Sequence, residues 1–183
     1  MTREEAMELL KEYTKKPNLI KHALAVEGAM AAYARKFGED ENSWRIVGLL
    51  HDFDYEKYPD EKNHPYRGAE ILKEKGVPQD WIDAIMGHAE YTGVERKTLM
   101  AKTLYAVDEL TGFIIAVALV RPSKKLEDVT VKSVKKKMKD KAFAAAVDRE
   151  AIKRGAEELG VDLDEHIQTV LDGLKAVAED LGL

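Results

Sequence analysis

The chain has 183 residues, of which 45% are hydrophobic and 34% are charged, and its formal net charge at pH 7 is -5. This composition is typical of a soluble globular protein and argues against a largely disordered chain. The chain contains no cysteine, which excludes disulfides, thiolate zinc sites and cysteine nucleophiles.

Helical signals dominate the sequence, and no segment has the alternating pattern of a convincing strand. Amphipathic spacing and local start and stop signals predict eight helices. These cover about residues 3–13, 19–37, 42–51, 65–74, 78–90, 98–119, 142–159 and 163–181. We therefore expect an all-α protein made of stacked helices, with a C-terminal helical part after Pro122 that packs on the rest.

The expected helix ends follow from a few residues. Thr2 and Asp162 each open a capping box, and Asn18 is the expected N-cap of the second helix. Gly38 is expected to end that helix, because glycine readily adopts the left-handed backbone of a helix C-terminus. Between the predicted helices, residues 52–60 form a polar, aromatic loop.

A histidine and a carboxylate stand side by side directly after an apolar run. Residues 46–50 are apolar and predict burial at the end of a helix, where His51 and Asp52 follow. A buried carboxylate is unfavourable unless a cation or strong donor compensates it. Because histidine nitrogen and aspartate oxygen are good ligands for divalent ions, the pair indicates metal binding.

Asp108 is a second carboxylate whose burial needs compensation. It lies in the middle of the longest and most apolar helix, where no Lys or Arg lies beside it. Glu109 is the alternative, with Asp108 then on the helix surface. The spacing of the apolar residues favours Asp108. In the second helix, the spacing of the apolar residues places His22 on the face that packs inward.

Six residues on five separate helices or helix ends are therefore candidate ligands: His22, His51, Asp52, His64, His88 and Asp108. Several have an alternative structural explanation. His22 alone would serve as a hydrogen-bonded core histidine, His64 as a helix cap, and His88 as a residue at a surface helix end. His166 lies in a polar helix, and we interpret it as a surface residue.

The order of a histidine, a His-Asp pair and a distant aspartate resembles the HD-domain superfamily of metal-dependent phosphohydrolases. His22, His51, Asp52 and Asp108 occupy these four positions. His64 and His88 resemble the two extra histidines of the two-metal members. The resemblance covers about residues 19–120, and residues 106–138 are also similar to an uncharacterised prokaryotic subgroup.

This resemblance implies a single HD-domain-like helical bundle over residues 1–183. Residues 19–120 would be the metal-binding core, and residues 121–183 a C-terminal helical extension. The four shared positions would hold one divalent ion, and Asp52 would bridge to a second ion held by His64 and His88. One or two ions per chain are expected, from among Mn, Fe, Mg, Ni, Co and Zn.

The chain differs from the better-known groups of the superfamily near its His-Asp pair. Asp54-Tyr55 stands where two-metal relatives often carry Gly-Lys, and Tyr55 stands where one-metal nucleotidases carry Glu. His88 is single where cyclic-dinucleotide phosphodiesterases have paired histidines, whereas Asp60 matches a later acidic position of the nucleotidases. The resemblance therefore leaves the substrate open.

The expected reaction is hydrolysis of a small phosphate ester, with a nucleotide as the candidate substrate, by metal-activated water. Asp54, Glu56 or Asp60 would assist proton transfer. Phosphate would be bound by positively charged side chains: Lys57, Arg67, Arg121 and Lys124. For any single one of the first five, Asp54 to Arg67, the alternative is an ordinary loop charge, since the sequence does not show whether a carboxylate reaches the attacking water.

Two other classes of function remain open. The same ligands would accept iron, as in HD-type di-iron oxygenases, and a degenerate site would bind a nucleotide without cleaving it.

A positively charged segment follows the longest helix: residues 121–141 carry nine Lys or Arg and three Asp or Glu. This segment would either attract an anionic substrate or form a solvated helix face. No aromatic residue lies in this segment, so we expect no nucleic-acid partner.

The sequence shows no export signal, because residues 1–5 contain no apolar core and are acidic. The longest apolar run, residues 113–120, is too short to span a bilayer. We therefore expect a cytoplasmic protein without a membrane partner, and the sequence leaves its oligomeric state open.

Overall fold

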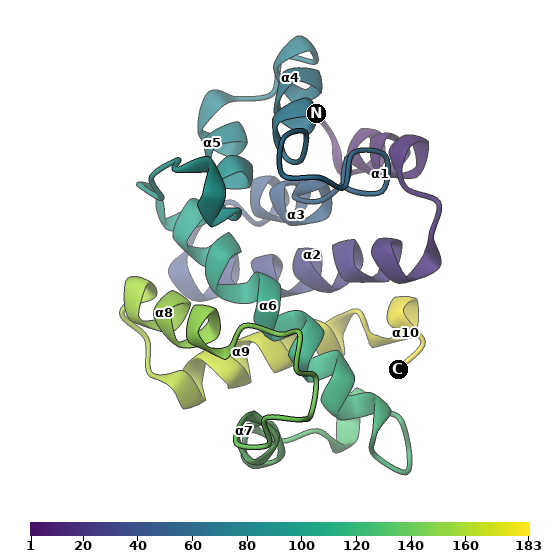
Figure 1. Ribbon diagram of the computed structural model, residues 1–183, viewed down its shortest axis with the longest axis vertical. Coiled ribbons are helices and arrows are strands. Elements are labelled where there is room, and N and C mark those ends of the chain that lie inside the picture. The colour runs from purple at the N-terminus through teal and green to yellow at the C-terminus, as the bar shows by residue number, and fades with distance from the viewer.

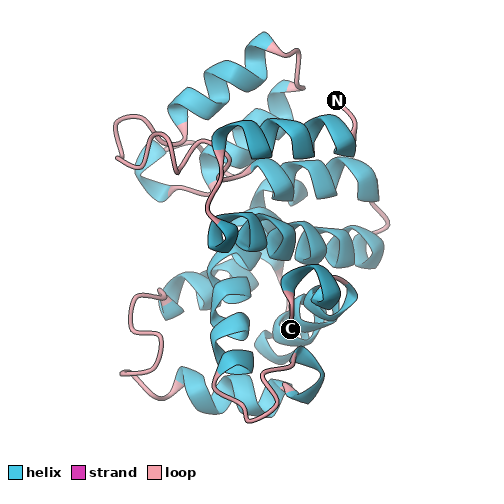
Figure 2. Ribbon diagram, turned by 90° about the vertical axis from the view of Figure 1, so that its right-hand side faces the viewer, coloured by secondary structure: helices cyan, strands magenta, loops and turns pink.

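The computed structural model describes residues 1–183 and contains helices and loops without strands, which confirms the all-α prediction (Figure 2). The elements are α1 (Arg3–Tyr13), α2 (Pro17–Phe37), α3 (Glu41–Leu50), α4 (Tyr66–Glu74), α5 (Gln79–Gly87), η1 (Glu90–Thr92), α6 (Leu99–Leu119), η2 (Leu126–Asp128), α7 (Val131–Met138), α8 (Arg149–Leu159), α9 (Leu163–Ala176) and α10 (Ala178–Leu181). None of the helices is both long and apolar enough to cross a membrane.

Helix α2 runs through the middle of the molecule (Figure 1). On one side it packs against α3, which in turn contacts α1 and α5. On the other side it packs against α9, and α6 crosses it and carries α8. A single apolar core joins residues of the N-terminal helices to residues of α9, such as Leu171 and Leu174.

Glycines permit the closest helix crossings. A Cβ on Gly173 of α9 would lie 2.6 Å from the carbonyl oxygen of Gly28 in α2, and one on Gly155 of α8 would lie 2.5 Å from the Cα of Ala106 in α6. Because real side chains do not approach this closely, both crossings require glycine. They bring the C-terminal helices directly against the two helices that carry His22 and Asp108.

Most helix ends agree with the sequence predictions. Thr2 forms the predicted capping box, and Gly38 ends α2 with a φ of 68°. The prediction for Asn18 was wrong, because α2 already begins at Pro17. The carboxylate of Glu56 accepts hydrogen bonds from the two amides that precede this proline. Asp162 is the N-cap of α9, but the predicted capping box is wrong, since its side chain accepts from the backbone N–H of Asp164.

The expected helix over residues 142–159 was wrong in its first half, since α8 begins only at Arg149. Asp148 is its N-cap and accepts hydrogen bonds from two first-turn amides. The Arg149 guanidinium donates to five carbonyl oxygens between residues 138 and 147, which holds this segment as a loop. Two other predicted helices are shorter than expected: α5 ends at Gly87, and residues 163–181 divide into α9 and α10.

Candidate metal centre

Close packing of α3 on α2 brings the first histidines together. A Cβ on Gly48 would lie 3.0 Å from the carbonyl oxygen of Val26, so glycine allows the two backbones to approach. His51 is the C-cap of α3, directly after the buried Leu50, and its imidazole lies edge-on to that of His22 at 5.0 Å between ring centres. The buried end of α3 therefore carries the His-Asp pair into the core, as the apolar run predicts.

The first cluster consists of His22, His51, Asp52 and Asp108, whose ligand atoms lie within 4.8 Å of one another. The Oδ1 atom of Asp108 is 2.9 Å from His22 Nε2 and 3.3 Å from His51 Nε2. Oδ2 of Asp52 is 3.4 Å from the same His51 nitrogen. The side chains come from α2, the end of α3 and the middle of α6.

The second cluster consists of Asp52, His64 and His88. The Oδ1 atom of Asp52 is 3.2 Å from His64 Nε2 and 3.1 Å from His88 Nε2. His64 precedes α4, and His88 is the C-cap of α5. Asp52 thus belongs to both clusters and directs a different oxygen towards each.

Hydrogen bonds on the far side of three imidazoles orient them for metal binding. His51 Nδ1 bonds the carbonyl oxygen of Gly48 at 2.7 Å, and His88 Nδ1 bonds that of Ile85. His64 Nδ1 bonds Oδ1 of Asp54 at 2.7 Å. A carbonyl or carboxylate acceptor fixes the proton on Nδ1, so each Nε2 lone pair points into the cluster, as a metal ligand requires. The donor set therefore suits a divalent ion.

The electrostatics of the two clusters also favour a cation between their carboxylates. Burial opposes a charge on His51, but the adjacent carboxylates of Asp52 and Asp108 raise its pKa well above the usual value. Burial likewise opposes charge on these carboxylates, yet the histidines hold the pKa of both far below the usual range. Despite its burial, hydrogen bonds to Asp52 and Asp54 raise the pKa of His64 to about 9. A cation is thus strongly favoured between these carboxylates.

Glu109 does not join the clusters. Its carboxylate accepts a hydrogen bond from the backbone N–H of Asp148, at 3.3 Å. Burial and the neighbouring Asp108 raise the pKa of Glu109. Of the two alternatives that the sequence left open on α6, Asp108 is the residue whose carboxylate lies among the histidines.

The three acidic residues expected to assist proton transfer have other partners. Asp54 is buried, and its two oxygens accept from His64 Nδ1 and from the backbone N–H of Gly68, so it orients a histidine. Glu56 binds the backbone amides before α2, and Asp60 binds Lys62 and Asn63 within its own turn. These contacts give each of the three carboxylates a part in holding the local structure.

The four residues expected to bind phosphate have other neighbours or lie beyond the end of α6. The ammonium group of Lys57 lies 4.8 Å from the centre of the Tyr13 ring, and exposed Arg67 pairs with Glu70 at 3.2 Å. Arg121 follows the end of α6, thirteen residues after Asp108, and a rise of 1.5 Å per residue places it about 20 Å away. Lys124 lies in the turn that follows, where its backbone N–H donates to the carbonyl oxygen of Arg121. The distance of about 20 Å places Arg121 away from the first cluster.

His166 is fully buried, contrary to its interpretation as a surface residue. Its Nε2 donates to the carbonyl oxygen of Ala106, at 2.9 Å, and its Nδ1 accepts from the Tyr33 hydroxyl. Burial lowers its pKa to about 4. It therefore joins α9 to α2 and α6 as a neutral side chain.

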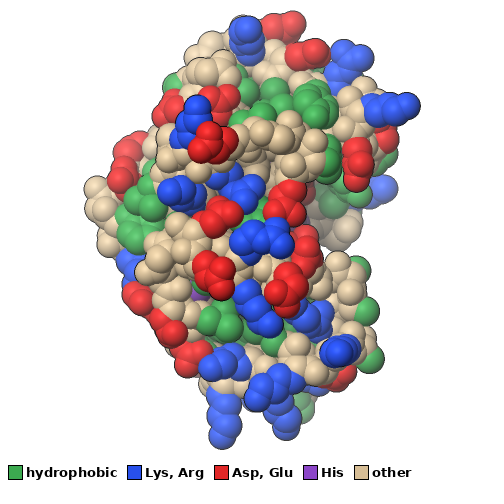
Figure 3. Space-filling view, turned by 60° about the vertical axis from the view of Figure 1, so that its left-hand side comes forward, with side chains coloured by type: hydrophobic (Ala, Val, Ile, Leu, Met, Phe, Trp, Pro, Cys, Tyr) green, Lys and Arg blue, Asp and Glu red, His purple; other side chains and the backbone are tan.

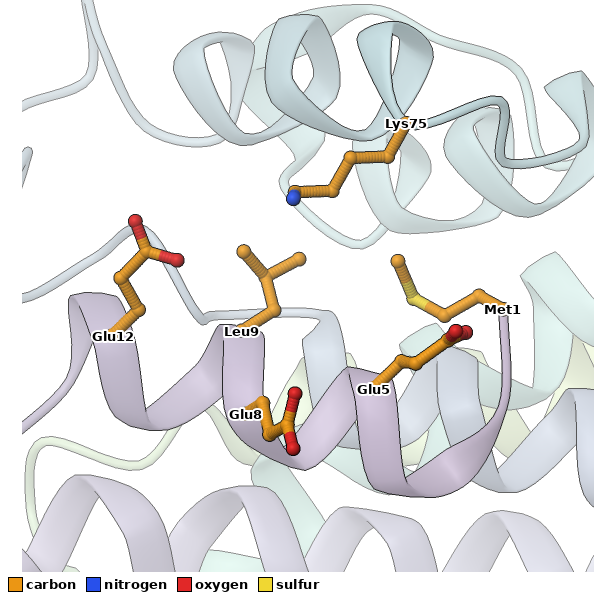
Figure 4. Close-up of a pocket in the computed structure, with 6 residues that line it drawn as sticks. All are labelled: Met1, Glu5, Glu8, Leu9, Glu12 and Lys75. Carbon is orange, nitrogen blue, oxygen red and sulfur yellow. The ribbon is translucent and has the colours of Figure 1, made fainter.

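Two charged surface grooves lie apart from the clusters. One, of about 520 Å³, is lined by three glutamates of α1 and by Lys75 beyond α4 (Figure 4). The other, of about 580 Å³, borders α7 and is lined by Lys132, Lys135, Lys136 and Lys139 together with Val131 and Asp164. Lys and Arg side chains gather at this end of the molecule (Figure 3).

The fold and the donor set together define an all-helical protein with a candidate centre for divalent ions. A family model of the HD domain matches residues 19–112, which is half of the chain. The chain therefore belongs to the HD-domain family, as its histidine and aspartate pattern predicts.

Curated proteins that match between 52% and 62% of this chain are named ribonuclease Y. The protein from Oleidesulfovibrio alaskensis is 33% identical over 96 residues, covering 52% of this chain and 18% of that protein. The one from Nitratidesulfovibrio vulgaris strain Hildenborough is 33% identical over 99 residues, with the same coverage. The one from Fusobacterium nucleatum is 30% identical over 114 residues, covering 62% and 21%. The chain thus spans about a fifth of their length, and no solved structure matches it.

Proposed function

We propose that the protein is a metal-dependent phosphohydrolase that cleaves a small phosphate ester, with a nucleotide as the candidate substrate. The observation that carries this proposal is the position of Asp52. One of its oxygens faces His22 and His51, and the other faces His64 and His88. A carboxylate shared in this way suits two neighbouring ions, an arrangement common to enzymes of phosphate-ester chemistry.

The residues have separate tasks in this proposal. His22, His51, Asp52 and Asp108 would hold one ion, and Asp52, His64 and His88 would hold the other. When bound, a metal pair lowers the pKa of water and stabilises charge on phosphoryl oxygens. Asp54 keeps the proton of His64 on Nδ1, so that the opposite nitrogen remains available.

The ribonuclease Y relatives support phosphate-ester chemistry in general terms, because their name denotes cleavage of RNA. The match covers only about a fifth of the length of these relatives, which is too little to fix a substrate for this chain. A substrate screen therefore includes nucleoside monophosphates, cyclic nucleotides and short RNA.

Hydrolysis of these esters by protein loaded with Mn²⁺ tests the proposal, followed as phosphate release from the monophosphates and as chromatographic product formation from cyclic nucleotides and RNA. Activity is expected to disappear with a chelator and in Asp52→Asn, but to persist in Asp60→Asn, which carries the same substitution in an exposed turn. Absence of hydrolysis for every ester would contradict it. Oxygen consumption by Fe²⁺-loaded protein without phosphate release would favour the di-iron oxygenase instead, because histidine and carboxylate ligands also suit iron.

A further inference from the structure

Two of the four exposed large apolar side chains lie beside the candidate metal centre. Tyr55 is 40% exposed and Tyr91 is 44% exposed. The other two, Leu119 and Val120, lie at the far end of α6, more than ten residues beyond Asp108. The tyrosines are far apart in the sequence, yet both contact His64.

Tyr55 presents its ring next to the second cluster. Its ring centre is 5.3 Å from that of His64, and the two planes meet at 82°. In this perpendicular contact at least one face of the tyrosine ring is turned away from the imidazole. That face can receive another planar group next to a residue of the second cluster.

Tyr91 is fixed through its hydroxyl group. It lies in η1, and its hydroxyl donates to the carbonyl oxygen of His64 at 2.5 Å. This bond anchors the phenol end, although nearly half of the side chain remains in contact with solvent. The residue therefore offers a rigid aromatic surface whose ordering requires little additional entropy on binding.

We propose that Tyr55 and Tyr91 form a base-binding subsite, in which the base of a nucleotide stacks while its phosphate occupies the metal centre. This inference rests on the proposed function and names the part of the substrate that the metal ligands do not contact. Stacking on an aromatic side chain is tolerant of base identity, because every base has a π face. The subsite thus selects nucleotides over non-aromatic phosphate esters with little preference among the bases.

Binding of two probes to the Mn²⁺-loaded chain tests this subsite. Adenosine monophosphate and ribose 5-phosphate share the phosphate and the sugar, but only the first carries a base. Stacking predicts at least about fivefold tighter binding of the first probe in calorimetric titrations. Tyr55→Leu and Tyr91→Leu should each reduce this ratio and leave the affinity for ribose 5-phosphate unchanged, whereas Tyr55→Phe should preserve it.

Leu119→Ala is the matched control, since it removes an exposed apolar side chain far from the clusters. The subsite would be contradicted if wild-type protein bound the two probes equally or bound neither. It would also be contradicted if the leucine variants reduced the affinity for both probes to the same extent. Base-dependent binding that is lost in Tyr55→Leu, in a protein that hydrolyses none of the screened esters, would support the subsite and contradict the phosphohydrolase reaction.

Discussion

His166 and the histidines of the clusters occupy opposite electrostatic environments within one helical core. His166 is surrounded by neutral partners, a tyrosine hydroxyl and a backbone carbonyl, and burial lowers its pKa to about 4. His64 is also buried, but two carboxylates raise its pKa to about 9.

This contrast shows that burial alone does not decide what a core histidine does. Where carboxylates converge on it, a cation is stabilised between them, either a proton or a metal ion. Where only neutral groups surround it, the side chain stays uncharged and serves as a link between helices. The charges of the neighbouring residues therefore distinguish candidate ligands from structural histidines.

The largest effect that we predict on stability concerns His166. Its pKa is about 4 in the folded chain, compared with 6.5 when unperturbed, so the unfolded state binds the additional proton between these values. The free energy of unfolding should therefore fall as the pH decreases from about 6.5 to about 4, by at most about 3 kcal/mol from this residue. His166→Gln, which retains a donor but does not titrate, should lose less stability over the same range.

Urea unfolding of both proteins near pH 7 and near pH 4 measures this difference. Other groups titrate in both proteins, so only the difference between them reports on His166. Parallel loss of stability in the two proteins would contradict a neutral, buried His166.

A smaller effect is expected at Asp54, which acts on the clusters through His64. Asp54→Asn removes the charge and one of the two hydrogen bonds that this buried carboxylate accepts. Loss of such a supporting group typically weakens metal affinity by about 10- to 100-fold. Titration with Mn²⁺ should show this reduction for the ion at His64 and His88, and equal affinity in Asp54→Asn and the control Asp60→Asn would contradict the role.

The smallest effect is expected at Arg121, which lies about 20 Å from Asp108 along and beyond α6. Arg121→Ala should leave both the turnover of phosphate esters and their apparent affinity unchanged. Steady-state kinetics check this expectation, and a selective increase in KM would show that Arg121 reaches the substrate after all.

The sequence was sufficient to find the residues that the structure brings together. Three signals identified residues that lie together in the structure: the apolar run before His51, the carboxylate of Asp108 in an apolar helix, and the order of the histidines. Such signals are local or depend on order along the chain. They need no knowledge of how the helices cross.

The errors have identifiable causes. His166 shares a helix face with Val170 and Leu174, four and eight residues later, so its burial could have been inferred from helical spacing. The length of α6 could likewise have excluded Arg121 from the clusters. The bond from Asp54 to His64 depends on the path of a loop, which no local pattern specifies.

Metal analysis of protein purified without chelator or immobilised-metal resin tests the two-ion centre most directly. The shared carboxylate of Asp52 predicts about two ions per chain in the wild type, and about one in His64→Ala, because the four ligands of the first cluster remain. One ion in both proteins would contradict the second site. No ion in either, even after reconstitution with Mn²⁺ or Fe²⁺, would contradict a metal centre altogether.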